Sequence, residues 1–148
     1  MDLILWRHAE AEDGLADLSR ELTDKGRKQA AKMAAFLHRH LPADTRILLS
    51  PALRTQQTAA ALTTSFTTIP EIAPGASVDA VLQAARWPHA DGSVLVVGHQ
   101  PTLGAVAARL LGCEHDSLRI KKSGLVWLNY RADYGEVSLR LVITPEFL

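Results

Sequence analysis

Two arginines and two histidines stand where short apolar runs of the sequence end: Arg7, His8, Arg54 and His99. In open parallel sheets, ligands bind beyond the carboxyl ends of the strands, so we expect these four side chains to meet at one sheet edge. Arginine guanidinium groups match the geometry of phosphate oxygens and stay charged at any working pH. Histidine beside them can donate a proton when charged or attack as a nucleophile when neutral. These residue types predict an oxyanion site, and phosphoryl chemistry more than simple anion binding.

The apolar runs that would position these side chains are residues 3–6, 47–49 and 94–97. Each run is continuous and stops at polar or turn residues, which is typical of strands buried on both faces of a parallel sheet. Arg54 follows the second run by a few residues and lies in the first turn of a predicted helix, whose N-terminus would add backbone donors for an anion.

Four amphipathic stretches between and after these runs predict helices. Their limits are marked by capping and turn residues. The first follows Thr23 as N-cap and ends at Pro42, the second covers residues 52–64, the third begins near Ser77, and the fourth runs from Pro101 to Gly112.

The C-terminal part has a different pattern. Residues 125–130 and 137–143 flank a turn at 132–135, and side chains alternate along the second of them as in a strand. We therefore predict one domain over residues 1–148, a three-layer α/β/α fold with a mostly parallel central sheet and a C-terminal antiparallel hairpin. The irregular segments 9–22 and 65–76 are long for loops, and the first is a candidate rim for the site.

Composition excludes several classes of protein. Sixteen basic and sixteen acidic residues give zero net charge, which argues against a nucleic-acid surface or a polybasic membrane face, although a small cationic pocket remains compatible with it. Cys113 is the only cysteine, so no intramolecular disulfide and no cysteine metal cluster is expected, and we expect it to be buried. We expect no metal or cofactor. The N-terminal apolar run is too short for a signal peptide and no window would span a membrane, which predicts a cytoplasmic protein.

Four blocks of sequence carry a family resemblance. The string LILWRHAEAE resembles the RHG motif that names the histidine phosphatase (phosphoglycerate-mutase-like) superfamily, with Ala9 in place of the usual glycine. Further matches follow in the family's order, namely LTDKGRKQA at 22–30, SPALRTQQTA at 50–59 and VGHQPTLG at 97–104. The short chain, without an insertion after the second block, looks most like the phosphohistidine phosphatases of the SixA type.

The resemblance implies a role for each matched residue. His8 would be the nucleophile that takes up the phosphoryl group as a covalent phosphohistidine. Arg7, Arg54 and His99 would hold the non-bridging oxygens, and preorganised charge of this kind is usually the largest contribution to catalysis. No metal would be needed. We expect Ser50 to serve turn geometry.

One departure from the family bears on the substrate. Larger members carry a glutamate that protonates the leaving oxygen, and Pro74 stands at that position here, with Glu71 three residues early. Loss of general acid catalysis typically costs 10²–10⁴-fold with an alkoxide leaving group. The imidazole of phosphohistidine departs more readily, so a missing acid favours a P–N substrate. Four carboxylates of the first loop remain alternatives for the acid: Glu10, Glu12, Asp13 and Asp17.

The leading hypothesis is therefore a phosphatase that acts on a phosphohistidine-bearing protein, for example a phosphotransfer domain, and on neither nucleic acid nor a membrane. The first alternative is a small-molecule phosphomonoesterase of the same fold. The second is a non-catalytic phosphoprotein-binding module, which the presence of His8 disfavours. The pair Lys121-Lys122 is expected in solvent, where it would be available to a docking phosphoprotein.

Overall fold

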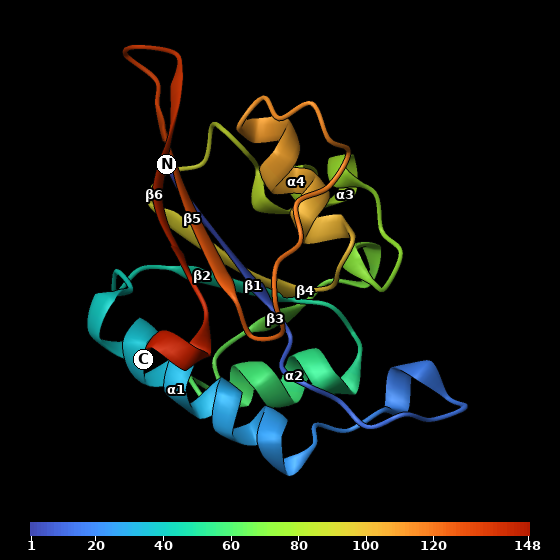
Figure 1. The fold of residues 1–148 in the computed structure, drawn as a ribbon. Helices are drawn as coiled ribbons and strands as arrows, with labels where there is room; N and C mark the ends of the chain where they lie inside the picture. The colour runs from blue at the N-terminus through green and yellow to red at the C-terminus, as the bar shows by residue number, and fades with distance from the viewer.

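The computed structural model describes residues 1–148, which form a six-stranded sheet with helices on both faces (Figure 1). The sheet order is β3-β2-β4-β1-β5-β6, in which the first four strands are parallel and β5 and β6 are antiparallel to their neighbours. In chain order the elements are β1 (Asp2–Arg7), α1 (Asp24–His40), β2 (Arg46–Leu49), α2 (Leu53–Ala60), β3 (Thr67–Thr68), α3 (Val78–Ala85), β4 (Ser93–Gly98), α4 (Thr102–Leu110), β5 (Leu125–Arg131) and β6 (Glu136–Ile143).

The two faces of the sheet carry separate hydrophobic cores. Side chains alternate between faces along a strand, so Leu3 and Leu5 of β1 pack in the core under α3 and α4. Ile4 and Trp6 pack in the core under α1 and α2 on the other face (Figure 1). This explains the continuous apolar runs, and the predicted three-layer α/β fold is confirmed. None of the helices combines the length and apolar character that a membrane crossing requires.

The C-terminal hairpin extends the sheet beyond β1. β5 pairs with β1, and β6 forms the outer edge, joined to β5 by a turn in which Gly135 has a φ of 61°. The hairpin was predicted from alternation and is confirmed. β1, which is distant from β5 in the sequence, lies inside the sheet between β4 and β5, and its Ile4 is paired with Trp127.

Three local predictions were wrong. The short strand β3 lies inside the segment 65–76 that was expected to be irregular, because its two residues pair with Leu48 and Leu49 of β2. The second helix ends at Ala60 and the chain continues in a turn. Cys113 is exposed, directly after the turn that follows the end of α4 at Leu110.

The strand register brings the ends of three strands side by side. Arg7 at the end of β1 is paired with Gly98 at the end of β4, and Leu49 at the end of β2 is paired with Val97. The residues that follow these positions are His8, Ser50 and His99, so they emerge at the same edge of the sheet.

Candidate active site

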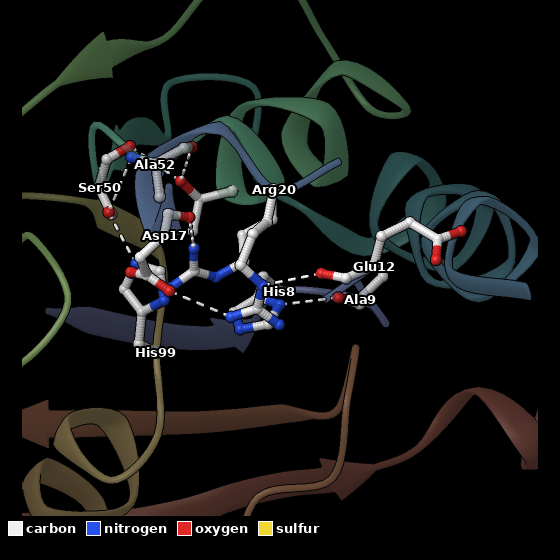
Figure 2. A network of polar contacts seen from close by, with 10 residues as sticks. His8, Ala9, Glu12, Asp17, Arg20, Ser50, Ala52 and His99 are labelled. Carbon is white, nitrogen blue, oxygen red and sulfur yellow. Dashed lines mark hydrogen bonds and ion pairs between the residues drawn. The ribbon is translucent and has the colours of Figure 1, made fainter. Parts of the chain in front are cut away.

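The four predicted side chains gather at this edge. The rings of His8 and His99 lie with their centroids 5.2 Å apart, and Arg54 comes from the first turn of α2. His8, Arg54 and His99 retain only 9%, 4% and 5% of their accessible surface. Figure 2 shows how His8, Asp17 and His99 converge from three separate segments. Buried charged and polar side chains need partners, and the partners described below define the site.

His8 is held as a neutral ring with one nitrogen available. Its Nδ1 lies 2.7 Å from the carbonyl oxygen of Ala9, which only accepts, so Nδ1 carries the proton and donates it. The lone pair is therefore on Nε2. Burial, helped by the charges of Arg54 and Arg7, lowers the pKa of His8 to about 4, although the Ala9 hydrogen bond acts in the opposite direction. A neutral imidazole with a free Nε2 is the form that can attack phosphorus.

The alanine that replaces the family glycine fits its position. Ala9 is fully buried and packs with Leu22 and Ala30, so its methyl group fills space in a small apolar cluster. Its N–H donates to Thr58 Oγ1 at 3.0 Å, and the same hydroxyl donates to the carbonyl of Arg54 at 2.7 Å. The segment after β1 and the helix that carries Arg54 are thereby joined through one buried side chain.

His99 is positioned by Ser50. The Nε2 of His99 and the Oγ of Ser50 share a hydrogen bond of 2.7 Å, and the same Oγ accepts the N–H of Ala52 at 3.2 Å. Ser50 therefore serves the turn, as predicted, and also orients a histidine, which sequence reasoning missed. Burial lowers the pKa of His99 to about 3, and nearby His8 and Arg54 act in the same direction. Both histidines are neutral near pH 7.

The two arginines and His99 each present a buried nitrogen atom without a hydrogen-bond partner. Arg7 donates from Nη1 to the carbonyl of Ile120 at 2.8 Å, and Arg54 donates from Nη1 to the carbonyl of Asp17 at 2.7 Å. The Nε atoms of both arginines and the Nδ1 of His99 are buried without a hydrogen-bond partner. Unpaired buried polar atoms are costly, so their grouping around His8 is typical of an anion-binding site.

One carboxylate touches this cluster. Asp17, from the loop after β1, approaches Arg54 Nη2 with its Oδ2 at 3.2 Å and accepts from Arg20 at 3.1 Å. The Arg20 hydrogen bond, with help from Arg54, lowers the pKa of Asp17, so the group is an anion near pH 7. Among the four candidate acids of the first loop, Asp17 is the one whose carboxylate bonds a predicted site residue. Glu10 instead accepts from Thr23 Oγ1 at 2.9 Å.

The segment that carries Pro74 also reaches this edge of the sheet. Thr102, at the start of α4 just after His99, donates from Oγ1 to the carbonyl of Ala76 at 2.6 Å. The end of this segment is thereby fixed beside the start of α4. Glu71 is exposed on the 3₁₀ turn Pro70–Ile72.

The glycines of two matched blocks allow close packing around the site. A Cβ at Gly26, in the first turn of α1, would overlap the carbonyl oxygen of Glu10, and one at Gly104 of α4 would overlap the carbonyl oxygen of Leu118. Thr23 caps α1 by accepting from the N–H of Gly26 at 2.9 Å, as predicted. These contacts hold α1 against the segment after His8, and the chain before β5 against α4.

Comparison with known proteins identifies the family. The model of the histidine phosphatase superfamily (branch 1) matches residues 3–76, which include Arg7, His8 and Arg54. The phosphohistidine phosphatase SixA of Escherichia coli is 33% identical over 119 residues, which cover 74% of each chain. The chain belongs to the histidine phosphatase superfamily.

Solved structures of the family agree with the fold. The protein histidine phosphatase SixA complexed with tungstate superposes with a TM-score of 0.80 at 28% identity, over 99% of each chain. A SixA-type structure from Agrobacterium tumefaciens gives a TM-score of 0.82 at 27% identity, over 97% of each chain. The resemblance stated from the four sequence blocks is confirmed at the level of the family, with SixA-type proteins among its similar members.

Proposed function

We propose that the protein is a phosphohistidine phosphatase with His8 as its nucleophile and a phosphohistidine-bearing protein as its substrate. The observation that carries the proposal is the state of His8: a neutral ring, with its proton on Nδ1 and its free Nε2 among buried cationic and N–H donors. This arrangement suits attack on a phosphoryl group whose oxygens are held by Arg7, Arg54 and His99.

In the first step, Nε2 of His8 attacks the phosphorus atom and the P–N bond to the substrate imidazole breaks. The two electrons of that bond stay with the departing ring, which leaves as neutral imidazole when its other nitrogen carries a proton. The three non-bridging oxygens keep their charge throughout, and the guanidinium groups of Arg7 and Arg54 stabilise it. The phosphoryl group is then bonded to His8.

In the second step, water attacks the phosphoryl group on His8 and the new P–N bond breaks. Phosphate leaves, His8 regains its lone pair on Nε2, and one water proton goes to solvent or to the phosphate. The bond from Nδ1–H to Ala9 holds the ring in one orientation through both steps, and it stabilises the positive charge that the ring carries while phosphorylated.

The carboxylates near the site support a P–N substrate over an ester. An alkoxide leaving group needs a proton donor, and a donor must be protonated at the working pH. Asp17, which bonds Arg54, has a lowered pKa and is ionised, and the segment at the family's acid position contributes Pro74. Imidazole leaves without such help.

Two substrates compared in EDTA test the proposal. One is a histidine-phosphorylated peptide, and the other is p-nitrophenyl phosphate together with a panel of alkyl phosphomonoesters. We expect fast turnover of phosphohistidine and little turnover of the alkyl esters, with His8→Ala inactive on both.

The other outcomes identify the alternatives. Efficient hydrolysis of an alkyl ester would overturn the P–N preference and favour a small-molecule phosphomonoesterase. Phosphate binding without turnover of any substrate would favour a phosphoprotein-binding module.

A further inference from the structure

All five lysines of the chain line a single cavity beside the active site. The cavity has a volume of about 720 Å³ and no hydrophobic side chain in its lining. Its basic lining residues are Arg7, Lys25, Lys28, Lys32, Arg119, Lys121 and Lys122. Glu146 is the one carboxylate among them. We call this cavity the lysine cleft. A chain of zero net charge thus concentrates cations at one place.

Most of these cations are not neutralised within the protein. Lys121 pairs with Glu146 at 3.2 Å, and Lys122 pairs with Glu10 at 3.3 Å. Lys25, Lys28, Lys32 and Arg119 form no ion pair, and Arg119 contributes to a lowered pKa of Arg7 after the larger effect of burial. Uncompensated like charges in a concave site raise the local concentration of an anionic ligand.

The lysine cleft is continuous with the reaction centre. Arg7 belongs to both, and Gln100 in its lining directly follows His99. Ser123, next to Lys122, donates its N–H to the carbonyl of His8 at 3.1 Å. Anionic groups bound in the cleft would therefore lie next to the proposed phosphoryl position.

The lining suits a surface with several negative charges better than an apolar organic ligand. Pockets for small molecules are mainly apolar with a few polar groups, whereas this one offers only polar and charged side chains and a proline. Lys25, Lys28 and Lys32 are exposed along one side of α1 and span about 10 Å, or two helical turns. Carboxylates spaced by three and four residues on a partner's helix have the same spacing.

We propose that the lysine cleft docks an acidic helical face of the phosphohistidine-bearing protein, next to its phosphorylated histidine. This inference rests on the proposed function, since it names the partner's surface for the same site. Flexible ammonium groups would steer the acidic face by long-range attraction, while Arg7, Arg54 and His99 hold the phosphoryl group.

The test uses two synthetic helical peptides with one phosphorylated histidine, followed along one face by three glutamates or by three glutamines. We expect kcat/KM for the glutamate peptide to exceed that for the glutamine peptide by at least tenfold at low salt. The preference should shrink as salt rises, because screening weakens exposed charges. In K28E/K32E the ratio of the two values should fall to one or below. The matched control is R27E/R39E, which changes the same charge at exposed positions of α1 outside the cleft and should keep the preference.

Binding of the unphosphorylated glutamate peptide, followed by fluorescence anisotropy, separates the two proposals. Equal turnover of both phosphopeptides by the wild-type protein would overturn the docking proposal and leave the proposed function standing. Salt-dependent binding of the glutamate peptide without hydrolysis of either phosphopeptide would support docking and overturn the proposed function. Binding of an RNA oligonucleotide or inorganic polyphosphate in preference to the glutamate peptide would overturn the docking proposal in favour of that polyanion.

Discussion

The buried histidine and arginine cluster and the lysine cleft differ in how their charges are held. His8, Arg54 and His99 are nearly inaccessible, and each is fixed by hydrogen bonds to backbone or to Ser50. The cleft lysines are long, exposed side chains, and those on α1 have no ion-pair partner. Fixed charges stabilise a transition state because the protein does not have to rearrange during the reaction. Charges on mobile side chains attract a partner at long range but do not fix how that partner is oriented. If both proposals hold, the chemistry and the recognition of the partner are carried out by separate regions, with Arg7 lining both of them.

The largest effect is expected at the centre of the buried cluster. His8→Ala removes the only atom proposed to take up the phosphoryl group, so turnover of a phosphohistidine peptide should fall by about 10⁴-fold or more. Quenching the wild-type protein in alkali should trap a labelled, acid-labile phosphoprotein, and the variant should carry no label.

If His8→Ala still carried the label, His8 would not be the nucleophile, and another residue of the cluster would have to take that role. Thermal unfolding of His8→Ala at the temperature of the wild-type protein would show that the variant is folded.

Arg54 tests whether charge alone suffices in the buried cluster. Arg54→Ala removes a buried guanidinium and should reduce kcat/KM by about 10²–10³-fold, the scale seen for loss of one fixed donor to an oxyanion. Arg54→Lys keeps the charge but loses the planar fork, so it should recover only part of that activity. Full activity of the lysine variant would mean that the buried cluster works by charge alone, as the cleft is proposed to do.

The pH dependence of stability should report the two buried histidines. Their folded pKa values of about 4 and about 3 lie below the ordinary value of 6.5, so between these limits the unfolded chain binds more protons than the folded one. The contribution of the two histidines to the free energy of unfolding is therefore fully present above pH 6.5 and is lost as the pH falls towards 4. Denaturant unfolding at pH 7, 5.5 and 4.5 should show this loss.

NMR of the protein with ring-labelled histidine reports the protonation of His8 and His99 individually. The His8 and His99 resonances should remain those of neutral rings down to about pH 5, and inorganic phosphate should raise both pKa values because a bound dianion favours the charged form. Titration of His8 near 6.5 in the free protein would contradict the description of a neutral nucleophile held by burial.

The sequence predicted the buried cluster, but of the cleft it indicated only the exposed pair Lys121-Lys122, for a physical reason. Apolar runs that end in polar residues predict strands and the edge where they end, so Arg7, His8, Arg54 and His99 could be placed together without coordinates. The cleft is lined mainly by α1 and by residues 119–122, which are distant in the sequence and come together only in the folded chain. Periodicity places each lysine on a surface but does not say which surfaces face each other. The same limit left four acidic candidates in the first loop, of which the structure brings Asp17 to Arg54.

The smallest expected effect concerns Asp17, which touches the buried cluster from the exposed loop. Its carboxylate lies 3.2 Å from Arg54 Nη2 and competes with an anion for that guanidinium. Because the Asp17 carboxylate is exposed and solvent screens its charge, Asp17→Asn should tighten phosphate or tungstate binding by only about two- to tenfold, measured by calorimetry. The same variant should leave phosphohistidine turnover within a small factor of wild type. A loss of 10²-fold or more with an alkyl ester, but not with phosphohistidine, would make Asp17 a proton donor that gains its proton once phosphate neutralises Arg54. In that case the charge on Asp17 would change during turnover. The buried cluster would then no longer differ from the lysine cleft by having fixed charges, and the two regions would differ only in where they lie.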